Sequence, residues 1–569
     1  MNYAPYGFAL LIVGALLVGF AVWRYRGTGS SSESLQRLRS QLYFAGLSFL
    51  ILGPLLAPSG YILTLDVAWG PHYVFNQLDN PASASRLFIS TLMFGLHTLL
   101  GSELAQSVFI LLILFLVGWG MYTALPIKRQ LARYFAGTFY VLNPFVYDRL
   151  ISGQWLLLLG YALLPFAFRA LYRLMREPNS RTALWVAVWW LAMTLCSFHY
   201  LFIFGLVFLV GWAIALLSAA HKRPVLRHWA SALGWYLLFN LFWLIPAAVS
   251  AGEASFVDQT HPFTFATRGD VLGSAWASVL LLQGFFGQKG IQLASQNLAV
   301  AGLFLPLIGL AVYGAVQAIQ NRPWRDLTMT LAASAYLAIV LAVGVASAGS
   351  RELYLWLFDF VPGFTAMREP QKFVVLLALF YAVFGAYGLV KLYDRWREPW
   401  QRGLLVITAG ALILLQALPM LNGLAGQIRR TDYPIGWYRV RDITNESPEG
   451  KVLVLPWQQY FSLPFASQDK VIANPVPAVL DRPSYVSRRI DVAGASEPAN
   501  RPIDLVADRI DWRKELNDND LQVLKAYDIR WIVVLNSIKR VNAEQLLQFP
   551  QVRERYRDTD ILLLELDQQ

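Results

Sequence analysis

The sequence predicts a polytopic α-helical membrane protein with a small soluble α/β module in its C-terminal part. Hydrophobic residues make up 56% of the 569 residues and charged residues only 15%, and the mean hydropathy is +0.45. Apolar runs recur as far as residue 421, with the length of roughly 17–25 residues that crosses the hydrocarbon core as a helix. Beyond residue 421 the apolar runs shorten to the length of β-strands.

The apolar runs predict about twelve transmembrane helices, because a helix satisfies its own backbone hydrogen bonds where no water is present. We expect the first run to be a retained helix, since it lacks a basic n-region and an A-x-A-like cleavage site. The predicted spans are 5–23, 42–63, 104–125, 132–147, 154–172, 182–197, 200–219, 229–250, 298–319, 327–347, 372–391 and 403–421.

Lysine and arginine alternate between the connectors and predict the orientation. The connectors 24–41, 126–134, 169–181, 220–228, 320–326 and 391–402 together carry 20 of these residues. The alternate connectors 64–103, 148–153, 251–297 and 348–372 carry 7. The positive-inside rule therefore places the first set in the cytoplasm and the second set, with the N-terminus and residues 422–569, outside.

Residues 422–569 are expected to form the soluble α/β module, following the multi-spanning domain of residues 1–421. Strand-like runs cover Val452–Leu455, Ile529–Leu535 and Ile561–Leu566, and helix-like pieces cover 519–527 and 543–548. Asp518 or Asn519 is expected to cap the first piece. The acidic run 517–520 lacks the glycine and distal glutamate of a calcium loop, so a helix cap is the favoured interpretation.

Several function classes are not supported by the sequence. The net charge of +11 is explained by topology and anionic lipid, and no basic run is interleaved with aromatic residues as in a nucleic-acid groove. Cys196 is the single cysteine, which excludes an intramolecular disulfide and a thiol–metal cluster. No Walker lysine loop is present, which argues against an ATP-driven pump.

Polar residues gather in the loops that are predicted to lie outside. Asp66 lies just past an apolar stretch. It is notable because holding a carboxylate at the edge of a bilayer costs free energy unless water solvates it or it has a functional role. This placement suggests an enzyme that takes its substrate from the lipid phase, with the outer loops forming one polar cavity. The candidate residues are Asp66 and His72 (first loop), Arg149 and Gln154 (second), His199 (third), Glu253, Asp258 and His261 (fourth), and Arg368, Glu369 and Lys372 (fifth).

Three motifs carry a resemblance to a known family. They are Asn143-Pro144-Phe145-Val146-Tyr147-Asp148-Arg149 leading to Gly153-Gln154, the string Gly160-Tyr161-Ala162-Leu163-Leu164-Pro165, and Arg368-Glu369-Pro370-Gln371-Lys372-Phe373. With the acid in the first outer loop, they resemble the GT-C superfamily of glycosyltransferases, close to its arabinofuranosyltransferase-like members and the related YfhO-type proteins. The resemblance covers roughly residues 42–420, and the C-terminal module more loosely.

The resemblance implies a sugar donor linked to polyprenyl phosphate, a glycan, lipid or protein acceptor outside the membrane, and a base on the first outer loop. That role falls on Asp66. The chain departs from the family in having one acid there rather than a pair, and an extra span before the loop. Such a transfer needs a base for the acceptor proton and cations or donors for the leaving phosphate. We assign the phosphate to Arg149, Arg368, Lys372 and His199.

Each assignment has a structural alternative. Asp66 would instead cap the following turn or pair with a loop arginine, and Arg368 would pair with Glu369 to shape the proline turn. The Lys372 side chain would only extend to the membrane–water interface. Arg149 would pair with Asp148, and His199 would hydrogen-bond a backbone group. The other candidates, with weaker arguments, are His72, Gln154, Glu253, Asp258, His261 and Glu369.

The predicted function is transfer of a sugar, arabinofuranose or another pentose or hexose, at the outer face of a prokaryotic plasma membrane. No cofactor is required, and no ligand cluster demands a divalent metal, although a metal at the phosphate stays open. Two other classes remain. A lipid or solute transporter would also have many spans, and a noncatalytic assembly protein of envelope polysaccharide biogenesis would use the outer module alone.

The orientation can be tested with single cysteines added to the chain, whose sole native cysteine is Cys196. A cysteine at Ser255 or Ser447 should react with an impermeant thiol reagent from outside, because both lie in connectors poor in Lys and Arg or beyond the last span. A cysteine at Ser31 should stay unlabelled in sealed cells and react after permeabilisation. Labelling from the opposite side would contradict an outward-facing site.

Overall fold

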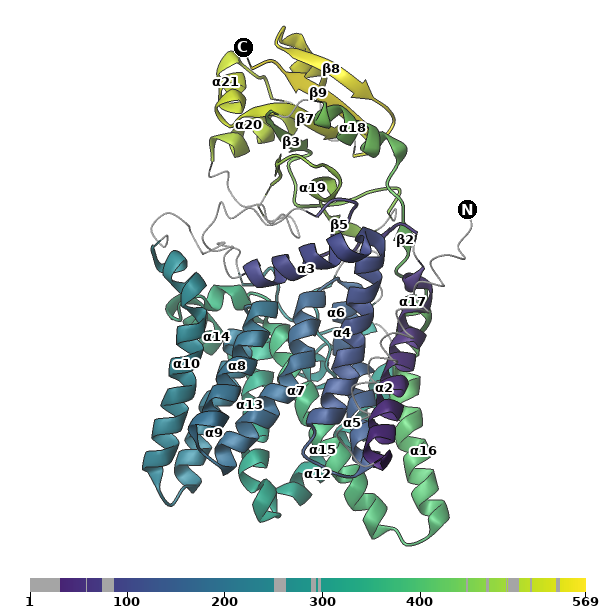
Figure 1. Ribbon diagram of the computed structural model, residues 1–569, viewed down its shortest axis with the longest axis vertical. Coiled ribbons are helices and arrows are strands. Elements are labelled where there is room, and N and C mark those ends of the chain that lie inside the picture. Colours follow the sequence, from purple (N-terminus) through teal and green to yellow (C-terminus); the bar gives the residue numbers. More distant parts are fainter. Residues whose placement is uncertain are drawn as a thin grey trace.

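The computed structural model describes residues 31–57, 59–73, 86–249, 262–287, 293–294, 298–446, 449–466, 470–487, 489, 501–511, 514–538 and 543–568. These residues form a bundle of long helices and, at one end of it, a smaller region built on a β-sheet (Figure 1). The two parts correspond to the long apolar runs and to the strand-length runs of the sequence.

The bundle is made of helices that lie roughly side by side (Figure 1). Within the described ranges six helices are long and apolar enough to cross a membrane. The number is seven if the bent pair of helices Pro399–Gln416 and Leu418–Ala425 is counted as one span. The protein is thus a multi-pass membrane protein, but the predicted number of twelve is not confirmed. The bundle helices are α2 (Ser31–Leu52), α4 (Ser102–Ala124), α5 (Gln130–Val141), α7 (Trp155–Arg176), α8 (Ser180–Cys196), α9 (Tyr200–Ser218), α10 (Lys222–Val249), α12 (Leu298–Ile319), α13 (Arg322–Val343), α15 (Val374–Arg395) and α16 (Pro399–Gln416).

The predicted spans differ from the helices in two places that matter for the site. The span 132–147 is broken: α5 ends at Val141, and the short helix α6 (Pro144–Ile151) begins anew. The Asn143 side chain accepts a hydrogen bond from the Val146 amide and caps α6, with proline in its first turn, where the missing N–H costs nothing. The span 42–63 also ends early, at Leu52, because Gly53-Pro54 begins the 3₁₀ helix η1 (Gly53–Leu56).

The outer loops contain further short elements. Helix α3 (Leu87–Leu100), in the first outer loop, lies across the end of the bundle (Figure 1). Helices α11 (Ala275–Leu280) and α14 (Ala348–Phe360) and the 3₁₀ turns η4 (Gly344–Ala346), η5 (Phe364–Met367) and η6 (Pro370–Phe373) occupy the later loops. After α16, η7 (Leu418–Met420) and α17 (Leu421–Ala425) lead out of the bundle.

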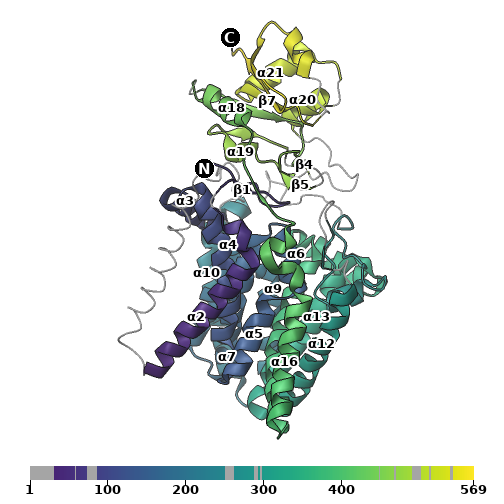
Figure 2. The ribbon, with the colours of Figure 1, turned by 90° about the vertical axis from the view of Figure 1, so that its right-hand side faces the viewer.

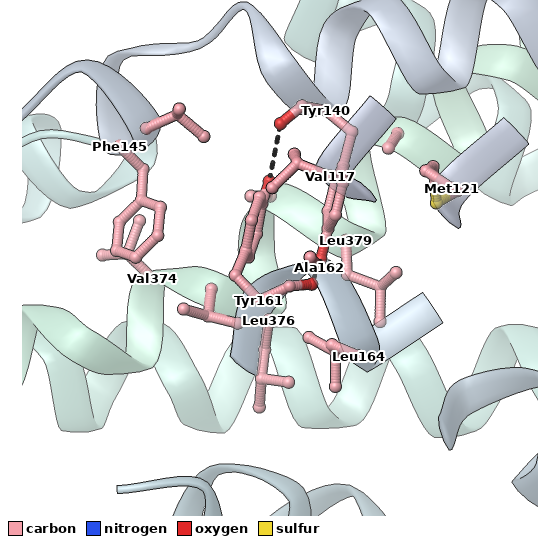
Figure 3. Packing of buried hydrophobic residues seen from close by; sticks show 14 of the residues in the cluster. Val117, Met121, Tyr140, Phe145, Tyr161, Ala162, Leu164, Val374, Leu376 and Leu379 are labelled. Carbon is pink, nitrogen blue, oxygen red and sulfur yellow. Dashed lines mark hydrogen bonds between the residues drawn. The ribbon is translucent and has the colours of Figure 1, made fainter. Parts of the chain in front are cut away.

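A core of large side chains lies where α4, α5, α6, α7 and α15 meet (Figure 3). Tyr140 of α5 and Tyr161 of α7 stack with ring centroids 3.9 Å apart. Each hydroxyl donates to the backbone oxygen of the other residue, at 3.1 and 3.2 Å. These hydrogen bonds satisfy polar groups that would otherwise be costly in an apolar interior, and they join α5 to α7.

The C-terminal region is a five-stranded sheet with strand order β6-β3-β7-β9-β8. Strand β3 pairs in parallel with β6 and β7, whereas β9 pairs antiparallel with β7 and β8. Alternate residues of β3 and β7 pack on opposite faces of the sheet. The strands are β3 (Lys451–Leu455), β6 (Ser484–Tyr485), β7 (Ile529–Leu535), β8 (Val552–Arg557) and β9 (Ile561–Leu566).

Helices cover both faces of this sheet (Figure 2). Helices α18 (Ile435–Asn445) and α19 (Val476–Val479) pack on one face, and α20 (Pro502–Asp511) and α21 (Asp518–Ala526) on the other. The predicted cap of α21 was wrong by one residue: Asn517 caps the helix in a reciprocal box with Asp520. Residues 543–548 form the 3₁₀ helix η8 (Ala543–Gln548).

The first outer loop joins the bundle to the C-terminal region. Strand β1 (Tyr61–Ile62) pairs antiparallel with β2 (Arg430–Thr431). The Arg430 guanidinium donates to backbone oxygens of the same loop, to Leu55 at 2.9 Å and to Gly60 at 2.6 Å. Farther along, the Tyr433 hydroxyl donates to the Trp69 oxygen at 2.7 Å. The segment that carries Asp66 is therefore held on both sides of that residue.

Candidate active site

Asp66 lies at the junction of the two regions, and its carboxylate is the accessible member of the site. Its backbone amide donates to the Ser152 oxygen at 3.0 Å, which holds the loop against the end of α6. The Gln154 amide donates to Asp66 Oδ2 at 3.0 Å, and the Tyr460 hydroxyl donates to Oδ1 at 3.4 Å. The side chain is exposed. Among the described residues, its side-chain hydrogen bonds are to Gln154 and Tyr460, so it neither caps the following turn nor pairs directly with an arginine there.

The turn after α6 allows this approach because it contains a glycine. Gly153 has φ +80, in the left-handed region that glycine adopts at no steric cost. A Cβ at this position would overlap the Thr64 hydroxyl and lie 2.9 Å from a Val67 methyl group. The glycine thus lets residues 64–67 pack on the α6–α7 turn and brings Asp66 within reach of Gln154.

Glu369 is the centre of a buried ion cluster next to Asp66. Arg149 donates to Glu369 Oε2 at 3.1 Å, and Lys372 donates to Oε1 at 2.9 Å. Gln154 Nε2 also donates to Oε2, at 2.9 Å, and its own oxygen accepts from Arg149 at 2.7 Å. The side chains of Arg149, Glu369 and Lys372 are only 1, 10 and 7% exposed, so each charge depends on the others for compensation.

The contacts in this cluster show which of the structural alternatives apply to Arg149 and Lys372. Glu369 pairs with Arg149 and Lys372, whereas Asp148 accepts from the Ala294 amide at 3.1 Å. Lys372 is buried and does not extend to the interface. Arg149 also lies over the Phe285 ring, 4.5 Å from its centroid, so the guanidinium is enclosed by aromatic and charged groups.

His199 completes the cluster on the side of the α8–α9 turn. Its Nε2 lies 2.8 Å from the Lys372 ammonium, and its Nδ1 lies 2.7 Å from the Ser197 hydroxyl. Because an ammonium only donates, Nε2 accepts and the ring proton sits on Nδ1. The lowered pKa of His199 agrees, since burial and the positive charge of Lys372 both disfavour the imidazolium.

The remaining predicted residues fall into three groups. Arg368 is half-buried near the cluster and lies over the Phe265 ring, 5.2 Å from its centroid. His72 is directed to the C-terminal region instead, where Nδ1 lies 2.8 Å from Asp481 Oδ1. Glu253, Asp258 and His261 lie outside the described residues.

The surroundings of Asp66 and Glu369 shift the pKa values of these two carboxylates in opposite directions. Partial desolvation at the junction of the two regions and the negative charge of Glu369 raise the pKa of Asp66 to about 6, against hydrogen bonds from Gln154 and Tyr460 and the charge of Lys372. Burial alone would raise the pKa of Glu369, but Lys372, Arg149 and the Gln154 hydrogen bond hold that pKa well below its ordinary value. Glu369 is therefore a permanent anion, and Asp66 is a carboxylate that exchanges protons near neutral pH.

Two residues of the site were missed by sequence reasoning. Tyr460 comes from the C-terminal region, 394 positions from Asp66, and no local pattern in the sequence connects the two. Asp148 is fully buried, and burial raises its pKa to about 7 despite the Ala294 amide and Arg149. Its neighbour Arg149 drew attention in the sequence, whereas Asp148 was considered only as a partner for it.

No metal centre is evident in the described part of the chain, where no three or more His, Cys, Asp or Glu side chains are grouped to hold an ion. The arrangement offers instead one accessible carboxylate and, beside it, three cationic side chains and one anionic side chain. Such a set can accept a proton and attract a phosphate.

The ion cluster predicts a large effect of Glu369→Gln. The amide keeps the shape but leaves Arg149 and Lys372 buried without a counter-charge, at a cost of roughly 3–5 kcal/mol. Folded protein recovered after heating in detergent should fall sharply for this variant. Glu352→Gln, at an exposed glutamate of α14, is the matched control and should behave as wild type. Equal heat resistance of the two variants would contradict the cluster.

Comparison with known proteins supports a fold assignment. No family model and no curated protein matches the sequence. Among solved structures, the arabinofuranosyltransferase AftD from Mycobacteria (mutant R1389S) superposes with a TM-score of 0.56 and 16% identity. The match covers 93% of this chain and 41% of AftD, so the chain spans less than half the length of that protein.

Two further solved structures show weaker likeness. The oligosaccharyltransferase of Archaeoglobus fulgidus has a TM-score of 0.44 and 12% identity over 93% of this chain and 73% of that one. ArnT from Cupriavidus metallidurans, bound to undecaprenyl phosphate, has a TM-score of 0.46 and 12% identity over 94 and 98%. The likeness to AftD shows that this chain and that structure share a fold.

Proposed function

We propose that the chain is a membrane glycosyltransferase that moves a sugar from a polyprenyl-phosphate donor to an acceptor hydroxyl, with Asp66 as the general base. The observation that carries the proposal is an accessible Asp66 carboxylate that Gln154 links to the buried Arg149–Glu369–Lys372 cluster, in a GT-C-like fold. Base and phosphate-binding charge are the two requirements of the reaction.

The proposed chemistry is a single displacement. The acceptor oxygen attacks the anomeric carbon while Asp66 takes the proton of the acceptor hydroxyl. The bond between the anomeric carbon and the phosphate oxygen breaks, and the electron pair leaves with the polyprenyl phosphate. Because phosphate is a stable leaving anion, the reaction needs no second carboxylate as general acid, and attack opposite to the phosphate inverts the anomeric centre.

The charges around Asp66 favour an incoming phosphate. Arg149, Lys372 and Arg368 are cationic, Glu369 and Asp66 are anionic, and His199 is neutral. Asp148, whose pKa burial raises to about 7, is only partly ionised at neutral pH. The site therefore keeps a net positive charge, which acts strongly where the groups are enclosed. Arg368 is the most accessible of the three cations, so it is the direct phosphate contact in this proposal. Lys372 and Arg149 act from beneath it, and His199 orients Lys372.

The location follows the charge asymmetry of the loops. We place the site and the C-terminal region on the outer side of a prokaryotic plasma membrane, where the donor is presented by its lipid and the acceptor is an extracytoplasmic glycan, lipid or protein. Arabinofuranose is one possible sugar, since AftD is named as an arabinofuranosyltransferase, and another pentose or hexose is equally compatible with the residues.

Replacing Asp66 by Asn tests the base. Purified protein with a set of polyprenyl-phosphate sugars should form glycosylated product, and Asp66→Asn should lower the rate by roughly 10²–10⁴-fold. Wild-type activity should fall as the pH drops through about 6, where the carboxylate becomes protonated. Asp359→Asn, at an exposed aspartate of α14, should leave the rate unchanged. A transporter or assembly protein would give no product.

Replacing Arg368 by Ala tests the phosphate contact. The donor KM should rise on the order of tenfold, the effect of about 1.4 kcal/mol, while the acceptor KM stays near the wild-type value. Arg351→Ala is the matched control, because Arg351 also lies over a phenylalanine ring, 5.7 Å from the Phe263 centroid. A donor KM that changes equally in both variants would remove Arg368 from the phosphate site.

A further inference from the structure

We propose that Tyr460, supplied by the C-terminal region, is a positioning residue for Asp66, so that the active site is complete only when that region sits on the bundle. This inference rests on the proposed function, because it assigns a role relative to the proposed base. It gives the C-terminal region a part in catalysis in addition to any part in binding an acceptor or partner.

The first argument is the geometry of the Asp66 carboxylate. Gln154 of the bundle donates to Oδ2 at 3.0 Å, and Tyr460 donates to Oδ1 at 3.4 Å. One oxygen is therefore fixed by each region, and with both contacts the plane of the carboxylate is set. The Tyr460 contact is long for an O–H···O hydrogen bond, as is common for catalytic groups without substrate. Oδ1 is therefore held by a weaker hydrogen bond than Oδ2.

The second argument is the hairpin that carries Tyr460. Strands β4 (Tyr460–Ser462) and β5 (Val471–Ala473) pair antiparallel, with Phe461 opposite Ile472. Phe461 and Ile472 are buried in the core of the C-terminal region, whereas Tyr460 and Val471 pack against the core of the bundle. Because side chains alternate along a strand, this hairpin reaches both cores and sets the position of Tyr460 relative to Asp66.

The third argument is that the Asp66 loop is attached to the same region. The His72 amide donates to the Ala478 oxygen at 2.9 Å, and the Tyr433 hydroxyl donates to the Trp69 oxygen at 2.7 Å. A Cβ at Gly70 would lie within 2.8 Å of the Ala478 carbonyl carbon, so the two backbones are in close contact. The C-terminal region thus holds the loop and, through Tyr460, also the carboxylate.

The charges around Asp66 give the sign of the effect. The groups that act on its carboxylate are Glu369, Lys372, Arg149, Gln154 and Tyr460. The pKa of Tyr460 is raised by burial and by the charge of Asp66, so its hydroxyl stays protonated and donates. This hydrogen bond stabilises the ionised Asp66 and lowers the pKa of that carboxyl. Without it, Asp66 stays protonated, and inactive as a base, to a higher pH.

The test compares Tyr460→Phe with Tyr556→Phe in the full-length protein. Tyr556, on β8, donates to Asp558 Oδ2 at 3.0 Å, so the control removes the same type of hydrogen bond away from the site. Tyr460→Phe should lower kcat on the order of tenfold with little change in donor KM, and shift the acidic limb of the pH–rate profile upward by about one unit. Tyr556→Phe should reproduce the wild-type profile.

A second readout does not require turnover. Labelling of Asp66 by a water-soluble carbodiimide and an amine, followed by mass spectrometry of the Asp66 peptide, reports the protonated carboxyl as the pH is varied. The labelling midpoint should lie near pH 6 for the wild type and higher for Tyr460→Phe. An unchanged pH–rate profile and labelling midpoint in folded Tyr460→Phe protein would overturn the inference. If the wild type forms no product but the midpoint still shifts, the proposed function fails and the contact stands.

Discussion

The structure depends on the neutralisation of two buried cations by Glu369. Arg149 is fixed by α6 and Lys372 by the start of the segment that continues into α15, and both form an ion pair with this carboxylate. Burying ions is costly unless each is paired and hydrogen-bonded, so the α6 turn, the α8–α9 turn and the loop before α15 must converge at this point. The same network holds Gln154, and Gln154 holds Asp66.

Glu369 therefore accounts for both the shape of the site and its electrostatics. The anion that allows two cations to be buried also raises the pKa of the neighbouring Asp66. The Glu369 carboxylate stabilises the structure through its two ion pairs. The Asp66 carboxylate is accessible and has a pKa of about 6. The two positions differ in environment rather than in chemistry, as in other sites where paired acids take different roles.

Much of the fold follows from local patterns in the sequence. The long apolar runs predicted a multi-spanning helical protein, and runs buried on both sheet faces predicted β3, β7 and β9, because such strands are apolar throughout. Strand β8 was missed because only Val552 is buried in it and the rest is charged or half-exposed. The predicted span 132–147 runs through the break at Asn143 because the apolar run continues there, although Asn-Pro is a capping signal.

The site was predictable only in part. Loop topology indicated that Asp66, Arg149, His199, Glu369 and Lys372 would lie on one side, and the structure brings them together. Which anion pairs with which cation was not predictable, because ion pairing depends on the orientation of α6 after its break at Asn143. The Tyr460 contact needs the relative placement of two regions, which no local pattern contains.

The most direct measurement of the central claim is an electron cryomicroscopy structure of the protein with a non-hydrolysable polyprenyl-phosphonate sugar bound. The account predicts the phosphonate against Arg368, above the Arg149–Glu369–Lys372 cluster, and the face of the anomeric carbon opposite the phosphonate directed to the Asp66 carboxylate. A phosphonate bound away from these cations, or an anomeric carbon remote from Asp66, would contradict it.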